Sequence, residues 1–146
     1  MSHFSDLSAY TYKATGTSPK TLNVGWLDPS TNFPTGVSPA DLVDKLWELC
    51  CSPVVMTRGF HVCPFCKERN ARPYQVTRGK RTIKLGSAEI RVFGQDNVKF
   101  AAPDLIFHYV AEHFYLPPDE FVEAVLFGPA PGSGIYKHAL EKLNIS

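Results

Sequence analysis

A short run of metal-binding residue types, His61-Val62-Cys63-Pro64-Phe65-Cys66, constrains this chain more than any other feature. Two residues separate Cys63 from Cys66, a spacing that lets two thiolates approach one ion from a tight turn. His61 lies two residues before Cys63, so in an extended segment both side chains leave the backbone on the same face. A fourth ligand must come from elsewhere, and Cys50 stands at the end of a predicted helix just upstream.

These residues, Cys50, His61, Cys63 and Cys66, would supply three thiolates and one imidazole. Soft thiolates with an imidazole in four-coordinate geometry favour zinc, and a filled set of protein ligands is typical of a structural site. Cys51 lies about 100° around the helix from Cys50 and could replace it. The pattern therefore predicts one structural zinc ion, with the fourth ligand open between these two cysteines.

Enzymatic interpretations of the same residues are weaker. Cys63-Pro64-Phe65-Cys66 resembles the redox motif of glutaredoxin-like proteins, but a polar segment closed by a proline follows it instead of a long helix. His108 and His113 are five residues apart, about 140° around an ideal helix, so we do not expect them to share an ion. Glu89 is expected to face solvent from a strand. We therefore expect a non-enzymatic protein, with a zinc enzyme or a dithiol oxidoreductase as the lesser alternative.

Helix and strand signals alternate along the chain and predict an α+β fold. With 146 residues the chain is long enough for one domain, which we expect over residues 1–128, followed by a linker and short C-terminal helix over 129–146. The predicted architecture is a small antiparallel β meander with a zinc-knuckle-like C-x-x-C turn, packed against three or four helices. The expected strands are 21–27, 74–77, 81–85, 88–93 and 98–101, and the expected helices lie between Ser38 and Ser52, from Pro103 onward, over 119–127 and over 135–143.

The basic residues are unevenly distributed. Residues 67–100 contain nine of the 15 lysines and arginines but three of the 14 acidic residues. A basic segment can contact nucleic acid, although solvent-facing hairpin positions often carry lysine and arginine simply to protect strand edges. A nucleic-acid-binding zinc protein is thus the main alternative function, with phosphate contacts from Arg69, Arg72, Arg78, Lys80, Arg81 and Lys84.

The ends and the apolar segments give no export or membrane signal. The N-terminus lacks a basic start followed by an apolar run, and prolines and acidic residues interrupt the most apolar stretch, 100–127. We therefore expect a cytoplasmic protein without membrane contact. In a reducing compartment the four cysteines are expected to be ligands or redox thiols before they form disulfides.

Five segments together resemble a family of small uncharacterised bacterial proteins, over roughly residues 4–127. They are TLNVGWLD (21–28), LWELC (46–50), TRGFHVCPFC (57–66), LGSAEIRV (85–92) and AAPDLIFHYVAEHFYLPPDEFVEAVL (101–126). The resemblance implies that the family's C…H-x-C-x-x-C motif falls on Cys50, His61, Cys63 and Cys66, which favours Cys50 over Cys51. It implies no activity. A zinc-stabilised module that binds another protein, for example as an immunity or accessory protein of a toxin system, is the expected function.

Overall fold

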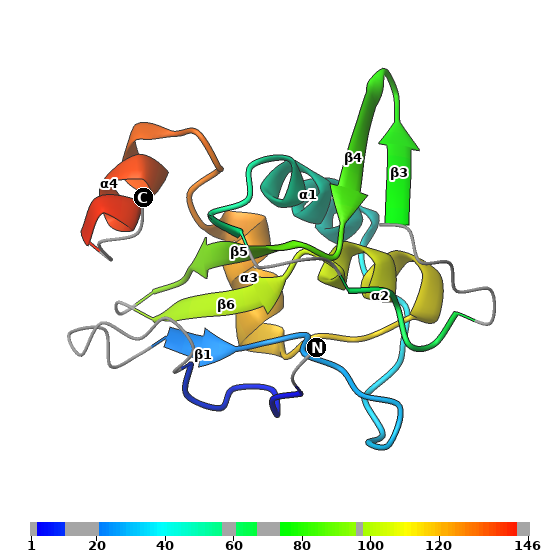
Figure 1. The fold of residues 1–146 in the computed structure, drawn as a ribbon. Helices are drawn as coiled ribbons and strands as arrows, with labels where there is room; N and C mark the ends of the chain where they lie inside the picture. The colour runs from blue at the N-terminus through cyan, green and yellow to red at the C-terminus, as the bar shows by residue number, and fades with distance from the viewer. Residues whose placement is uncertain (1–2, 11–20, 57–60, 67–73, 96–97, 143–146) are drawn as a thin grey trace.

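The computed structural model describes residues 3–10, 21–56, 61–66, 74–95 and 98–142 (Figure 1). Helices and strands are interspersed along the chain, and the strands pair in a mostly antiparallel manner, so the predicted α+β class is confirmed. The elements are β1 (Thr21–Asn23), α1 (Ala40–Cys51), β2 (Val55–Met56), β3 (Tyr74–Arg78), β4 (Arg81–Leu85), β5 (Ala88–Phe93), β6 (Lys99–Pro103), α2 (Ile106–His113), α3 (Asp119–Phe127) and α4 (Gly134–Lys142).

The strands form a four-stranded sheet in the order β1-β6-β5-β2 and a separate two-stranded sheet, β3-β4. Both predicted hairpins form, but they do not continue into one meander. β1 lies parallel to β6 at one side of the larger sheet, and β2 pairs antiparallel to β5 at the other. The hairpin β3-β4 lies beside α1, with which its Arg78 and Arg81 form hydrogen bonds.

The chain turns sharply at Gly86, which separates the two hairpins. Gly86 has a φ of +107°, and a Cβ at this position would lie 2.1 Å from the backbone oxygen of His61. Its carbonyl accepts a hydrogen bond from the His61 N–H at 2.6 Å, and its own N–H donates to Asp104 Oδ1 at 2.8 Å. Because only glycine combines this dihedral with such close backbone approach, the meander is broken here and the 61–66 segment is fixed beside it.

Three helices pack together on the larger sheet and bury the core. α1 contacts α2 and α3, and both α1 and α3 contact β5. The buried stripe of α1 consists of Leu42, Leu46, Leu49 and Cys50, as its spacing predicts. The Phe100 ring of β6 packs edge-on against Phe121 of α3, with centroids 5.6 Å apart. The apolar faces of these helices therefore match the sheet face that they cover.

Two helix starts differ from the prediction. Pro103 does not open a helix; it is the last residue of β6 and pairs with Glu89, and α2 begins at Ile106. Ser38 makes no side-chain cap hydrogen bond to α1, whose N-cap is Pro39. In both places a proline precedes the helix, and its fixed φ suits an extended residue as well as the first helical turn.

Candidate metal centre

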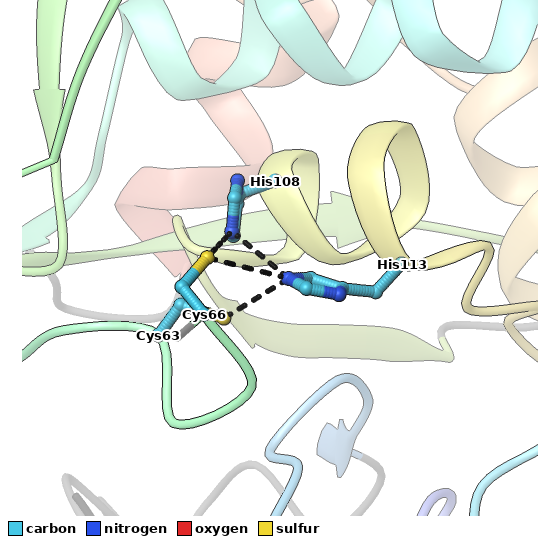
Figure 2. Close-up of side chains that lie close together, drawn as sticks. All are labelled: Cys63, Cys66, His108 and His113. Atoms are coloured by element: carbon cyan, nitrogen blue, oxygen red, sulfur yellow. Dashed lines mark hydrogen bonds between the residues drawn. The ribbon is translucent and has the colours of Figure 1, made fainter. Parts of the chain in front are cut away.

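Four metal-ligating side chains converge between the 61–66 segment and α2 (Figure 2). Cys63 and Cys66 come from the segment, and His108 and His113 come from the helix. Their ligand atoms all lie within 4.8 Å of one another. This cluster of Cys63, Cys66, His108 and His113, called the Cys2His2 cluster below, could hold a metal ion.

The ligand atoms are arranged around a common centre. The Nε2 atoms of His108 and His113 are 3.2 Å apart. Cys63 Sγ lies 3.3 Å from His113 Nε2, and Cys66 Sγ lies 3.2 Å from His108 Nε2 and 3.6 Å from His113 Nε2. Each imidazole therefore directs the same ring nitrogen toward the two sulfurs, as ligands of one ion do.

Burial sets the protonation of two members of the cluster. Cys63 and His108 are buried, whereas Cys66 and His113 are half-buried. Desolvation raises the pKa of the Cys63 thiol to about 11, and desolvation, together with the charge of His113, lowers the pKa of His108 to about 4. At neutral pH His108 is therefore in the neutral form that ligates metals, and a cation must displace a proton from Cys63 to bind it.

Phe65 fixes the cysteine turn on α2. Its ring packs edge-on against Tyr109 of α2 and against Phe33, with centroids 5.8 Å and 5.2 Å away. It also lies 5.6 Å from the ring of His113. Within the turn, the Phe65 N–H lies 3.4 Å from Cys63 Sγ, in position to donate to it. The same aromatic residue thus orients both the thiol pair and one of the histidines.

The end of α2 brings the two histidines together. The N–H of Phe114 bonds to Tyr109 O, five residues back, instead of four residues back as in an α-helix. The N–H of Tyr115 bonds to the same oxygen at 3.1 Å, and Phe114 adopts a left-handed conformation with a φ of 57°. In this widened turn the backbone rotates through a smaller angle per residue than in an α-helix. Side chains five positions apart, such as those of His108 and His113, therefore lie closer to the same face of the helix.

The histidine pair corrects the sequence-based expectation. His108 and His113 were expected to point apart, and the Nε2–Nε2 distance of 3.2 Å contradicts this. The expectation assumed 100° per residue throughout the helix, which fails at its last turn. The sequence does carry a signal for this arrangement. Two histidines lie near the end of one predicted helix, and Phe114-Tyr115, instead of a glycine, follow that helix.

Two predicted ligands lie outside the Cys2His2 cluster. Cys50 is buried in the core stripe of α1, and its thiol donates to the Asp104 carbonyl oxygen at 3.4 Å. His61 is held through its backbone by Gly86 and is only half-buried. Cys51 is also half-buried, and its carbonyl accepts from Arg81. Among the residues that the structure describes, Cys63 and Cys66 are therefore joined by histidines of α2 and not by Cys50, Cys51 or His61.

Glu89 is buried, contrary to the expectation that it faces solvent. The Glu89 and Arg91 side chains, both 1% exposed, form an ion pair of 2.9 Å on one face of β5. The Tyr10 hydroxyl donates to the same carboxylate oxygen at 2.9 Å, and the Tyr10 ring covers the guanidinium at 4.6 Å. Tyr10 therefore covers the ion pair on this face of β5, which the strand pattern alone did not reveal.

The basic residues predicted to contact nucleic acid are only partly described. Arg69 and Arg72 lie outside the described residues. Arg78 forms an ion pair with Asp44 at 2.8 Å and lies over the Trp47 ring, and Arg81 donates to the Cys51 carbonyl. Lys80 and Lys84 are exposed on the β3-β4 hairpin.

Helices that could cross a membrane are absent from the described part of the chain.

The comparisons place the chain in a family without assigning an activity. The model of a domain of unknown function, DUF7919, matches residues 2–126. The chain therefore belongs to this family, which confirms the predicted membership in an uncharacterised family. No curated protein and no solved structure matches the chain.

Proposed function

We propose that the chain is a non-enzymatic, zinc-stabilised protein-interaction module whose ion is held by Cys63, Cys66, His108 and His113. The observation that carries this proposal is the spacing of the four ligand atoms. Zinc binds sulfur at about 2.3 Å and imidazole nitrogen at about 2.0–2.1 Å, so a tetrahedral site requires about 3.6 Å between S and N and about 3.3 Å between two N atoms. The corresponding distances are 3.2–3.6 Å and 3.2 Å.

A structural role follows from the number and the source of the ligands. Four protein ligands fill a tetrahedral zinc site, whereas catalytic zinc retains one position for water or substrate. The ion would join the 61–66 segment to the end of α2, elements that are 42 residues apart between Cys66 and His108. Closing so long a loop through metal bonds stabilises the folded chain, and zinc held by both cysteines leaves no free dithiol for redox chemistry.

The surface beside the Cys2His2 cluster supports binding to another protein. Phe114, next to the ligand His113, is 61% exposed, and Val37 is 92% exposed. The two residues lie on adjoining segments, because the Gly36 N–H bonds to the Phe114 carbonyl at 2.9 Å. An ion that fixes His113 would thereby hold an apolar surface in place for a partner protein.

Metal analysis of matched variants tests the ligand set. The protein is purified without added metal, and zinc per chain is measured by plasma mass spectrometry for the natural sequence and for His113→Ala, Cys66→Ser, Cys50→Ser and Cys51→Ser. We expect about one zinc per chain in the natural protein and in the Cys50 and Cys51 variants, and a loss of binding in the other two. Zinc lost with Cys50→Ser but retained with His113→Ala would overturn the proposed set.

Nucleic-acid binding is a second candidate, favoured by the exposed basic residues of the β3-β4 hairpin. The hairpin exposes Lys80, Arg81 and Lys84. If these residues contact phosphates, affinity for a short duplex must fall steeply between 50 mM and 200 mM salt, by tenfold or more for a few contacts. Replacement of Lys80 and Lys84 by Gln would reduce both affinity and salt dependence, whereas binding that is absent or insensitive to salt would exclude this function.

A further inference from the structure

A second feature lies at the end of the larger sheet away from α2, where β5 turns into β6 (Figure 1). A groove of about 580 Å³ is present there, lined by residues from the end of β5, from β6 and from α3. Its apolar surface is formed by Leu22, Phe93, Val98, Phe100 and Phe127. The volume is within the range of binding pockets, which commonly measure about 300–1,000 Å³. The groove shares no residue with the Cys2His2 cluster.

Phe127 distinguishes the groove from ordinary surface. It is the last residue of α3 and is 84% exposed, while Ala124, one turn earlier, is buried. Gly128 follows, and a Cβ there would lie 2.4 Å from the backbone oxygens of both Phe93 and Ala124. The chain therefore packs tightly against β5 immediately after Phe127, which leaves the phenyl ring at the side of the groove as an exposed aromatic wall.

The charges at the groove are all of one sign among its described lining residues. Glu120 and Glu123 of α3 are exposed and line the groove, and no described lysine, arginine or histidine lines it. Neither carboxylate forms an ion pair with another described residue. They are three positions apart along the helix, so their Cβ atoms lie about 5–6 Å apart. An apolar occupant with two basic groups at matching spacing would satisfy both carboxylates.

From this complementarity we propose that the groove binds a segment of a partner protein that places a large aliphatic or aromatic side chain against Phe127 and two lysines or arginines against Glu120 and Glu123. The inference rests on the proposed function as an interaction module and specifies the chemistry of its partner. Apolar contact with Phe127 supplies affinity, and the two carboxylates supply preference for basic over acidic segments.

Selection from a random peptide library displayed on phage tests the proposal with the zinc-loaded full-length chain. We expect the enriched peptides to combine large apolar residues with lysine or arginine. A synthetic enriched peptide, measured by fluorescence anisotropy, should bind at least about tenfold more weakly to Glu120→Lys/Glu123→Lys and to Phe127→Ser. The control Asp41→Lys/Glu141→Lys changes the net charge equally at exposed positions on α1 and α4 and should bind within about twofold of the natural protein.

The proposal would be overturned by no enrichment, by enriched peptides without basic residues, or by binding that both groove variants retain. Self-association detected by sedimentation velocity and abolished by Phe127→Ser would show that a second copy of the chain occupies the groove, and would also overturn it. Zinc content and thermal unfolding are measured for every variant. A groove variant that loses binding but retains zinc separates failure at the groove from failure of the metal site.

Discussion

Asp104 connects the 61–66 segment to α2, the two parts of the chain that supply the Cys2His2 cluster. Replacing it should therefore change the stability of the chain in a direction that can be predicted. Its side chain accepts from the Gly86 N–H, and Gly86 in turn holds His61 at the start of the cysteine segment. Its backbone carbonyl accepts from the Phe107 N–H in the first turn of α2. Asp104 is 2% exposed, and burial raises the pKa of its carboxyl group from 3.8 to about 6.

A raised carboxyl pKa means that the ionised form is less favourable in the folded chain than in the unfolded one. The stability associated with Asp104 is therefore fully present below pH 3.8 and is lost as the pH rises toward and through about 6. Since one pKa unit corresponds to about 1.4 kcal/mol, ionisation costs about 1.6 kcal/mol at pH 5 and about 3 kcal/mol at pH 8.

Asp104→Asn retains an oxygen acceptor for Gly86 and removes the charge. We expect the variant to gain stability relative to the natural protein as the pH rises, by about 1.4 kcal/mol between pH 5 and pH 8. Urea unfolding of the zinc-loaded proteins, followed by circular dichroism at pH 5, 6, 7 and 8, measures this difference. Asp41→Asn, at an exposed position of α1, is the control and should show a constant difference. A constant or shrinking difference for Asp104→Asn would refute the reasoning.

Three further substitutions test the packing around the site and the sheet. Phe65→Ala should lower the unfolding free energy of the zinc-loaded chain by about 2–3 kcal/mol in urea, because Phe65 holds the cysteine turn on α2, and Phe65→Leu should recover about half; equal losses would contradict this. Phe114→Gly should raise stability by about 1 kcal/mol in thermal unfolding, because glycine adopts a positive φ without strain; destabilisation would show that the exposed ring contributes packing. Glu89→Gln should cost about 3–5 kcal/mol by leaving Arg91 as an uncompensated buried charge, and Glu89→Met combined with Arg91→Met should recover most of that loss in the same assay.

Local patterns were sufficient for much of the fold. The spacing of Leu42, Leu46 and Leu49 predicts the buried face of α1, and Gly128 marks the end of α3. The turns around Gly79 and 94–97 predict the two hairpins. These features depend on residues within a few positions of one another, where backbone preferences and hydrophobic periodicity act directly.

Contacts between residues far apart in the sequence could not be predicted from such local patterns. The parallel pairing of β1 with β6 joins Thr21 to Lys99, and no local signal specifies that register. Burial of Glu89 depends on Tyr10, which lies 79 residues earlier in the chain. A strand that alternates polar and apolar residues is ordinarily solvated on one face, so the pattern could not show that Tyr10 covers Glu89 and Arg91.

Half of the candidate site was predictable, because it depends on a local spacing in the sequence. The spacing of Cys63 and Cys66 places both thiols in one turn, and the structure keeps them together. The histidines depend on the widened turn at the end of α2, where the Phe114 N–H bonds five residues back. Ideal helix geometry cannot predict that widening. Its place just upstream and the family resemblance both favour Cys50 as a ligand, but its position on the buried stripe of α1 directs its thiol to the Asp104 carbonyl.

X-ray absorption spectroscopy at the zinc edge of the purified full-length protein tests the central claim most directly. The proposed site predicts a first shell of two sulfur atoms at about 2.3 Å and two imidazole nitrogens at about 2.0–2.1 Å, which disappears in His113→Ala. A shell of three sulfurs and one nitrogen would restore the Cys50, His61, Cys63 and Cys66 set, and a protein that binds no zinc would contradict both.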